Sequence, residues 1–312
     1  MAQNGRAVKV VALAGGVGGA KLLVGLDAGL GGNLTAIVNT GDDDSLYGAR
    51  ICPDLDIVTY WLAGIADERR GWGIAEDSFS VMDSLGRLGS PTWFRLGDRD
   101  FATCIHRTQR LSEGATLSGA TDEIRRALGV RTQVIPMSDD EVRTQIVTRD
   151  GETLAFQEYF VRRRADVDVA RVVFAGVEDA KPAPGVVDAI EAADRVIVCP
   201  SNPVVSVAPI LALPGIRDAL AAHPSVVAVT PIVRGAPLKG PADRLLKGLG
   251  IEVSASGVAR LYSGWCKTFV VDGSDAVEAE RAEGAGMRTV ILDTIMSDRD
   301  ASARLAESLL SL

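Results

Sequence analysis

The sequence predicts an α/β fold: a doubly wound, mostly parallel Rossmann-like sheet, with a helical excursion and a β-hairpin added to it. Short apolar runs alternate with segments of helical character along most of the chain, as in the βα repeats that build a parallel sheet. The runs are mostly apolar along their whole length, which is typical of strands buried on both faces. The first run also leads through a glycine-rich turn into a helical segment.

The first half of the chain contains three predicted strands. Residues 8–14 form the first strand, residues 20–30 form a helix, and residues 34–39 ("LTAIVN") form the second strand. We expect a mostly helical excursion at about 54–130, with loops around "RRGWG" and "SPTWF". The chain then returns to the sheet with a strand at residues 131–136.

The second half begins with a predicted β-hairpin at residues 143–156 ("RTQIVTRDGETLAF"), because Asp150-Gly151 favours a tight turn between two β-prone runs. The alternation then resumes, and a helix at residues 299–310 closes it. Further strands are expected at residues 172–174, 196–198, 226–229, 268–271 and 289–292. No repeat or low-complexity linker interrupts the pattern, so we predict a single α/β domain over residues 1–312.

The composition disfavours several classes of protein. The net charge is −8, whereas nucleic-acid-binding proteins normally have a basic face. The four cysteines form no Cys-x-x-Cys pair, and with two histidines the chain shows no zinc spacing, so we expect thiols in a reducing compartment. The first residues lack the apolar core of a secretion signal, and no apolar run is long enough to cross a membrane. We therefore predict a cytoplasmic protein that binds neither nucleic acid nor membrane.

The turn after the first strand, "AGGVGGAKLL", predicts a phosphate site. Its glycines allow the backbone to approach a ligand closely, and the N-terminus of the following helix favours an anion. The alternative is a tight strand-to-helix turn that binds nothing. The candidate phosphate-binding residues in this turn are Gly15, Gly16, Gly18, Gly19 and Lys21.

Two common nucleotide motifs do not fit the same turn. The dinucleotide pattern Gly-x-Gly-x-x-Gly, started at Gly16, fails at Lys21. The second strand also ends in Asn39 and Thr40, where a dinucleotide site would place an acidic residue. A P-loop would need Gly-Lys-Ser/Thr, and the chain has Ala20-Lys21-Leu22. An NAD- or FAD-dependent oxidoreductase is therefore disfavoured.

An acidic loop follows the second strand. Asp42 and Asp43 lie at the carboxyl end of that strand, beside the glycine-rich turn, and carboxylates next to a phosphate need a counter-cation. These two residues are the predicted Mg²⁺ ligands. Pro53 predicts the first turn of a helix that contains Asp54 and Asp56, and we expect one of this pair, Asp54 first, to cap the helix.

Two more segments place polar residues at predicted helix N-termini. "PSNPVVSV" repeats the strand–turn–helix design of the glycine-rich turn, so Ser201, Asn202 and Ser206 are candidate phosphate or nucleotide contacts. Simple capping by Ser201 or Asn202 is the alternative. "LGDRD" leads into another helix, where residues 98–100 are either site residues or an N-cap with an exposed ion pair.

Seven motifs occur in a fixed order: "AGGVGGAKLL", "NTGDD", "ICPDLD", "RGWGI", "LGDRD", "QEYFV" and "PSNPVVSVAPIL". Together they resemble the 2-phospho-L-lactate transferase family, also described as phosphoenolpyruvate transferase in actinobacteria. The motifs span residues 8–211, and weaker similarity continues to the end of the chain. "CPDLD" together with "LGDRD" is far more specific than the glycine-rich turn.

The resemblance implies a step in the synthesis of the deazaflavin coenzyme F-420. Members of the family transfer a phospholactyl or phosphoenolpyruvyl group from a guanosine diphosphate donor to the ribityl hydroxyl of the precursor Fo. They release GMP and need Mg²⁺, and a homodimer is expected. The alternative is a nucleotide-sugar-binding regulatory protein of the same superfamily that carries out no transfer.

The resemblance also assigns residues. Asp56 and Arg95 match positions that contact Fo, and Asp98 and Arg99 of "LGDRD" join them as substrate-binding candidates. Asp56 is the first choice, and Asp43 the second, for the aspartate that orients or deprotonates the attacking hydroxyl. No motif distinguishes lactyl, enolpyruvyl and glyceryl donors.

Three tryptophans fall in the helical excursion: Trp61, Trp72 and Trp93. They either wall a flat heterocycle or pack in the core, which is the more frequent fate of a tryptophan.

Overall fold

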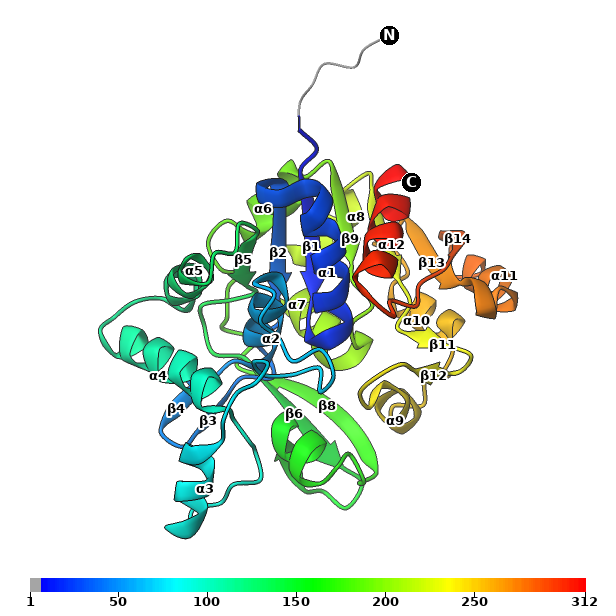
Figure 1. The fold of residues 1–312 in the computed structure, drawn as a ribbon. Coiled ribbons are helices and arrows are strands. Elements are labelled where there is room, and N and C mark those ends of the chain that lie inside the picture. Colours follow the sequence, from blue (N-terminus) through cyan, green and yellow to red (C-terminus); the bar gives the residue numbers. More distant parts are fainter. Residues whose placement is uncertain (1–6) are drawn as a thin grey trace.

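A parallel sheet forms the centre of the computed structural model, which describes residues 7–312. Within that range the sheet has seven strands, in the order β14-β13-β10-β9-β1-β2-β5 (Figure 1). They are β1 (Val10–Ala14), β2 (Leu34–Val38), β5 (Gln133–Pro136), β9 (Arg195–Val198), β10 (Val226–Val229), β13 (Thr268–Asp272) and β14 (Arg288–Leu292). Every neighbouring pair is parallel, so the predicted fold class is confirmed.

Helices cover both faces of the sheet, which is why β1 and β10 are buried at every residue. One face packs against α1 (Gly16–Leu30), α2 (Pro53–Leu62), α5 (Leu117–Ala127) and α12 (Arg299–Ser311). The other packs against α6 (Val186–Ala192), α7 (Ala208–Ala212), α8 (Ile216–Ala222), α10 (Ala255–Leu261) and α11 (Val277–Glu283).

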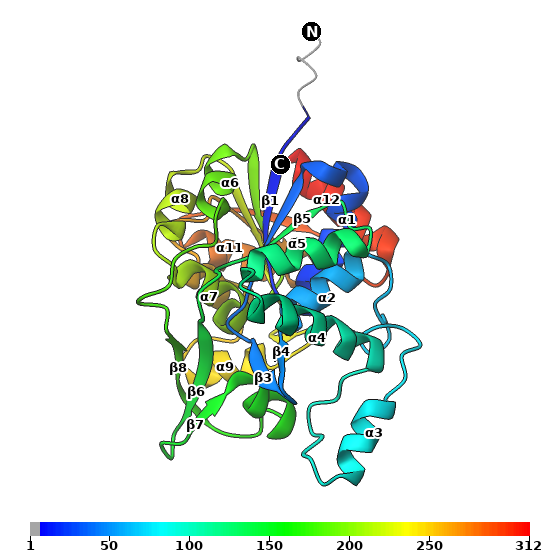
Figure 2. The same ribbon diagram turned by 90° about the vertical axis from the view of Figure 1, so that its left-hand side faces the viewer.

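A third group of elements lies beyond the carboxyl ends of the strands, in the lower half of Figures 1 and 2. The excursion at about 54–130 is helical as predicted: its helices α2 and α5 pack on the sheet, whereas α3 (Ser80–Arg87) and α4 (Asp98–Ser112) belong to this third group. The predicted hairpin is β6 (Arg143–Thr148) and β7 (Thr153–Ala155). The remaining elements of this group are β3 (Asp44–Leu46), β4 (Ala49–Ile51), η2 (Glu158–Arg162), β8 (Val169–Ala175), β11 (Ile232–Val233), β12 (Ala236–Pro237) and α9 (Ala242–Gly248).

The order of strands reverses between β1 and β9. The chain moves outward from β1 to β2 and β5, and after the hairpin it returns to β9 and continues in the other direction to β14. The connections after β1 and β9 therefore leave in opposite directions from adjacent strand ends. In open α/β sheets this is the crevice where ligands bind.

Two predictions about individual elements were wrong. Helix α1 begins at Gly16 and not at residue 20, so it includes Gly16, Gly18 and Gly19, which we assigned to a loop. The strand predicted at residues 172–174 exists as β8, but it pairs antiparallel with β6 and does not join the central sheet. β8 is only partly buried, with exposed Ala170 and Arg171, whereas a central parallel strand is covered on both sides.

The four cysteines are free and buried, as expected. Within residues 7–312 no single helix is long and apolar enough to cross a membrane. One pair of helical segments, Pro203–Ala212 and Ile216–Ala222, passes that test together but is bent by 93°.

Candidate functional site

A cavity of about 950 Å³ opens at the crevice between β1 and β9, a size typical of small-molecule sites. The loops that follow β1, β2, β9, β10 and β14 line it on the side of the sheet. The excursion lines it on the other side through α2 and α4, and so does the segment that follows the hairpin, which contains η2. Segments that are far apart in the sequence therefore share one site.

The glycine-rich turn and the loop after β9 are in contact. Ser201 Oγ accepts a hydrogen bond from the N–H of Gly15 (3.1 Å) and donates one to its carbonyl oxygen (2.8 Å). A β-carbon at Gly18 would clash with the carbonyl oxygen of Pro200, and one at Gly19 would lie 2.8 Å from Ser201 Oγ. Glycine is needed here because two backbones meet.

Asp54 connects the same turn to the end of β2. Its Oδ1 accepts a hydrogen bond from the N–H of Gly16 (2.8 Å), and its Oδ2 accepts one from Asn39 Nδ2 (2.9 Å). The side chain makes no capping bond to α2, so the expected cap is wrong: the carboxylate points into the site and not along its own helix.

Some of the predicted phosphate contacts are already engaged within the protein. The N–H groups of Gly15 and Gly16 donate to Ser201 and Asp54. Asn202 caps the turn η3 (Pro203–Val207) by accepting from the N–H groups of Val204 and Val205, which is the alternative that the sequence left open. The Gly15, Gly16 and Asn202 groups therefore hold the loops of the cavity in shape, and a ligand would bind to other hydrogen-bond donors.

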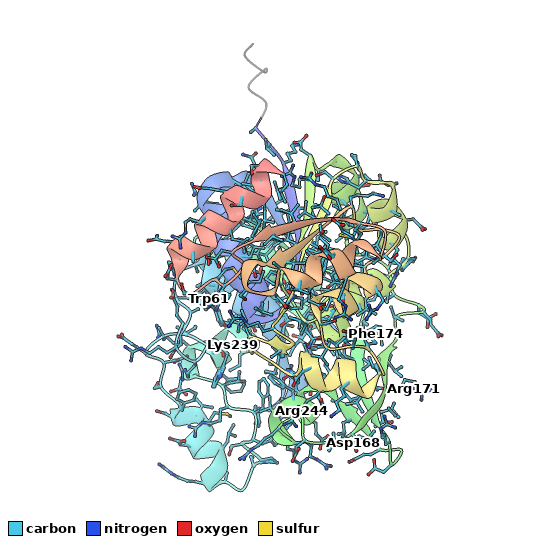
Figure 3. The ribbon with its side chains drawn as sticks, turned by 90° about the vertical axis from the view of Figure 1, so that its right-hand side faces the viewer. Trp61, Asp168, Arg171, Phe174, Lys239 and Arg244 are labelled. Carbon is cyan, nitrogen blue, oxygen red and sulfur yellow. The ribbon has the colours of Figure 1, made fainter. Side chains whose placement is uncertain are left out.

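Lys21 lines the cavity from α1, where its Nζ donates to the carbonyl oxygen of Met296 (2.8 Å). Burial and the nearby charge of Lys239 lower its pKa. Lys239 lies in the loop between β12 and α9 and also lines the cavity, near Trp61 in the view of Figure 3. Ser206 is a third polar lining residue, and it is buried.

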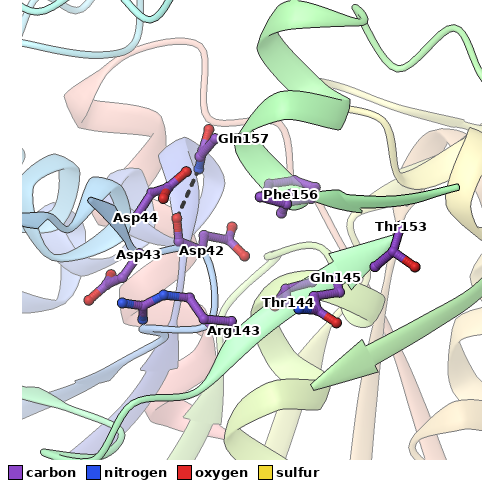
Figure 4. A pocket seen from close by; sticks show the side chains of 11 residues that line it. Asp42, Asp43, Asp44, Arg143, Thr144, Gln145, Thr153, Phe156 and Gln157 are labelled. Atoms are coloured by element: carbon purple, nitrogen blue, oxygen red, sulfur yellow. Dashed lines mark hydrogen bonds between the residues drawn. The ribbon is translucent and has the colours of Figure 1, made fainter. Parts of the chain in front are cut away.

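The carboxylates of Asp42 and Asp43 point in different directions (Figure 4). Asp43 accepts bonds from Arg50 Nη2 (3.3 Å) and Cys52 Sγ (3.0 Å). Burial raises the pKa of Asp43 to about 6, although Arg50 opposes the rise. Asp42 faces a smaller cavity of about 210 Å³ on the hairpin side and also lines the main cavity.

The electrostatic effect of Asp54 on Asp42 is larger than that of Asp43. Burial, then the charge of Asp54, raises the pKa of Asp42 well above its ordinary value. Burial also raises the pKa of Asp54 to about 6. Asp42 Oδ1 is buried and lacks a hydrogen-bond partner among the described residues, which is uncommon for a carboxylate oxygen. A buried carboxylate oxygen without a partner, on Asp42, beside a second carboxylate, Asp54, fits a divalent cation.

Asp56 is buried in an ion pair with Arg107 of α4. Arg107 Nη1 donates to Asp56 Oδ2 (3.1 Å), and Arg107 Nη2 donates to Asp56 Oδ1. Burial raises the pKa of Asp56, and the guanidinium opposes that rise. Asp56 lines the cavity, but both of its oxygens are bound to Arg107.

Of the predicted residues in and just before "LGDRD", only some line the cavity. Asp98 accepts bonds from Ser78 Oγ (2.6 Å) and from the N–H of Val81 (2.9 Å), so it caps α3 at the surface. Arg99 is exposed and pairs with Asp77. Neither of them lines the cavity, whereas Arg95 and Asp100 do.

A scan against protein-family models matches residues 10–308 to "2-phospho-L-lactate transferase CofD". The chain belongs to the CofD family. It is 47% identical over 312 residues to the phosphoenolpyruvate transferase of Streptomyces griseus and 49% identical to that of Streptomyces avermitilis. It is 39% identical to the phosphoenolpyruvate transferase of Mycolicibacterium smegmatis. Each alignment covers 98% of both chains, so the chain is a transferase of this family.

A solved structure shares the fold of this CofD-family chain. BH3568 from Bacillus halodurans, described as a member of the UPF0052 family, matches with a TM-score of 0.64 over 98% of this chain and 100% of its own. Only 18% of the aligned residues are identical, so the likeness concerns the architecture alone.

The cavity also has an aromatic wall that the sequence only partly indicated. Trp72 and Trp93 line the cavity, whereas Trp61 is buried beneath Lys21, whose Nζ is 5.9 Å from the centre of the indole ring. Phe156 and Phe160 line it as well, with their rings stacked 5.7 Å apart. Both belong to the "FQEYFV" segment, whose clustered aromatics were the available signal.

Proposed function

We propose that this CofD-family transferase moves a phosphoenolpyruvyl or phospholactyl group from a guanosine diphosphate-linked donor to the ribityl hydroxyl of Fo. GMP is released, and the product is a precursor of coenzyme F-420. The observation that carries the proposal is the single cavity, which has polar strand-end loops on one side and an aromatic wall on the other. The names of the actinobacterial relatives favour phosphoenolpyruvyl as the transferred group.

The donor diphosphate would lie at the start of α1. Lys21, Lys239 and the hydroxyl of Ser206 line this end of the cavity, and the helix N-terminus adds a favourable field for an anion. Phosphoryl transfer asks a protein mainly for positioning and charge stabilisation, so these groups supply what the donor needs.

Mg²⁺ would be held by Asp42 together with Asp54. This pair replaces the Asp42–Asp43 pair expected from the sequence, because Asp43 faces Arg50 and Cys52. Bound there, Mg²⁺ would supply positive charge against the donor diphosphate.

The acceptor would lie against the aromatic wall. Trp72, Trp93 and Phe160 offer flat apolar surface to a tricyclic ring, which aromatic side chains bind by stacking. Arg95, which the resemblance assigns to Fo, lines the same cavity, and its guanidinium lies 4.8 Å from the centre of the Phe79 ring, which supports a contact with the acceptor. The homodimer stays a prediction, and so does the single domain.

The direct test incubates the purified protein with Fo, Mg²⁺ and each of the three guanosine diphosphate-linked donors. Mass spectrometry of the products should show Fo extended by the phospho-acid, with one GMP formed per product and the phosphoenolpyruvyl donor used fastest. Asp54→Asn should abolish product, whereas Asp188→Asn, an exposed carboxyl on α6, should not. A protein that binds nucleotides but neither binds nor modifies Fo would instead be the regulatory alternative.

A further inference from the structure

Two buried carboxyls lie side by side beneath the cavity. Asp56 comes from α2 and Asp100 from α4, and each is 5% exposed. A carboxylate oxygen of each and Cys104 Sγ all lie within 4.8 Å of one another. Two like charges this close cannot both be ionised without a compensating cation.

Only one of the two carboxyls has such a cation. Arg107 binds both oxygens of Asp56. Asp100 has one neutral partner, Tyr60, whose hydroxyl donates to Oδ1 (2.9 Å). Among residues 7–312 no donor bonds to Asp100 Oδ2, and Asp100 lines the main cavity. Asp77 caps α4 in its place, by accepting from the N–H groups of Arg99 and Asp100, so capping does not explain Asp100.

The surroundings keep Asp100 ready to exchange a proton near neutral pH. Burial, then the charge of Asp56, raises the pKa of Asp100 to about 7. The groups that face it are Asp56 and Tyr60 on α2, Arg107 and Cys104 on α4, and Asp77 before α3. Arg107 and the hydrogen bond from Tyr60 act in the opposite direction.

A metal ion among Asp56, Asp100 and Cys104 is a poorer explanation of this cluster. The guanidinium of Arg107 already occupies the oxygens of Asp56. Burial raises the pKa of the Cys104 thiol, which disfavours the thiolate that a metal would need. The cluster therefore offers one free carboxyl oxygen to the cavity and no vacant ligand set.

We propose that Asp100, and not Asp56, takes the proton of the attacking acceptor hydroxyl. In this step the hydroxyl oxygen forms a bond to the phosphorus that carries the organic acid, and the bond from that phosphorus to the oxygen of GMP breaks. The proton passes to Asp100 Oδ2, and GMP leaves with the electron pair of the broken bond. Asp56, fixed by Arg107, is a positioning residue. The assignment rests on the proposed function.

The test compares Asp100→Asn with the wild type and with Asp188→Asn. The asparagine keeps the shape of Asp100 but cannot accept a proton, so kcat should fall by about 100-fold or more, as for loss of a general base. Binding of GDP and of Fo should change little. Wild-type kcat/KM should fall as the pH drops below about 7, and the residual activity of the variant should lack that limb.

Tyr60→Phe tests the same assignment while the carboxyl stays in place. Loss of the hydroxyl removes a hydrogen bond that favours the ionised form, so the acidic limb of kcat/KM should move to higher pH. Activity at pH 6.5 should then fall by a larger factor than activity at pH 9. A merely structural role for Tyr60 would lower activity equally at both values.

Two results would overturn the assignment while leaving the proposed function intact. One is an Asp100→Asn enzyme with wild-type kcat and an unchanged pH profile. The other is a variant whose only defect is weaker Fo binding, which would make Asp100 a binding residue. Absence of product from the wild type with every donor would instead contradict the proposed function itself.

Discussion

Gly18 is the residue at which the glycine-rich turn after β1 comes closest to the loop after β9. Its α-carbon faces the carbonyl oxygen of Pro200, with no room for a side chain. Gly29, in the last turn of the same helix, has open space around the corresponding position. The two glycines therefore allow one substitution to be compared at a contact and away from it.

Gly18→Ala should destabilise the protein by about 1–3 kcal/mol, because the backbone of Pro200 must move to admit the methyl group. It should also weaken GDP binding, since the displaced loop carries Ser201 and Ser206. Gly29→Ala should be neutral or stabilising by up to ~1 kcal/mol, because alanine favours a helix. Denaturant unfolding and calorimetric GDP titration measure both effects. If both variants lost the same stability and the same affinity for GDP, the close contact at Gly18 would not explain the effect.

The elements were predictable from the sequence where apolar runs or turn pairs define them. The central strands and the β6–β7 hairpin are of this kind. The start of α1 was not, because glycine disfavours a helix, whereas tertiary hydrogen bonds to the N–H groups of Gly15 and Gly16 help to hold that turn in place.

The sequence predicted which loops form the site, but not which of their side chains lie next to one another. The glycine-rich turn, "CPDLD" and "PSNPVVSV" do line one cavity. That Asp42 lies near Asp54, and Asp56 opposite Arg107, depends on how α2 and α4 pack, and spacing along the chain carries no such information. The same packing turns Asp100 inward and Asp98 outward, although both belong to one motif.

The ion pair of Asp56 and Arg107 joins α2 to α4. Arg107→Met leaves a buried carboxylate without its cation and should cost about 3–5 kcal/mol. The double variant Asp56→Asn with Arg107→Met should be more stable than Arg107→Met alone, because the stranded charge is gone. Urea unfolding of the four proteins in this cycle provides the measurement. If the double variant lost as much free energy of unfolding as the two single variants together, the two side chains would act independently.

The whole molecule gathers four carboxyls with raised pKa values around the main cavity: Asp42, Asp54, Asp56 and Asp100. Asp43, whose pKa is also raised, lies next to Asp42 and lines the smaller cavity. A carboxyl whose pKa is higher in the folded than in the unfolded chain favours folding at low pH, and that contribution is lost as the pH rises through the folded value. For Asp43 and Asp54 this happens near pH 6, and for Asp100 near pH 7.

The ligand-free protein should therefore melt at a lower temperature at pH 8 than at pH 5, by about 5 °C or more for a loss of ~2 kcal/mol. Millimolar Mg²⁺ should raise the melting temperature more at pH 8 than at pH 5, because the cation needs ionised ligands. Scanning calorimetry at the two pH values, with and without Mg²⁺, checks this. If Mg²⁺ raised the melting temperature of Asp42→Asn as much as that of the wild type, the cation would bind elsewhere.

The central claim is that one cavity holds the guanosine diphosphate moiety and the deazaflavin acceptor at the same time. The most direct measurement follows the fluorescence of Fo while it is titrated into protein, without GDP and with saturating GDP and Mg²⁺. Fo should bind the GDP-loaded protein as tightly as the free protein, or more tightly. Competition between GDP and Fo, or no binding of Fo in either state, would contradict the account.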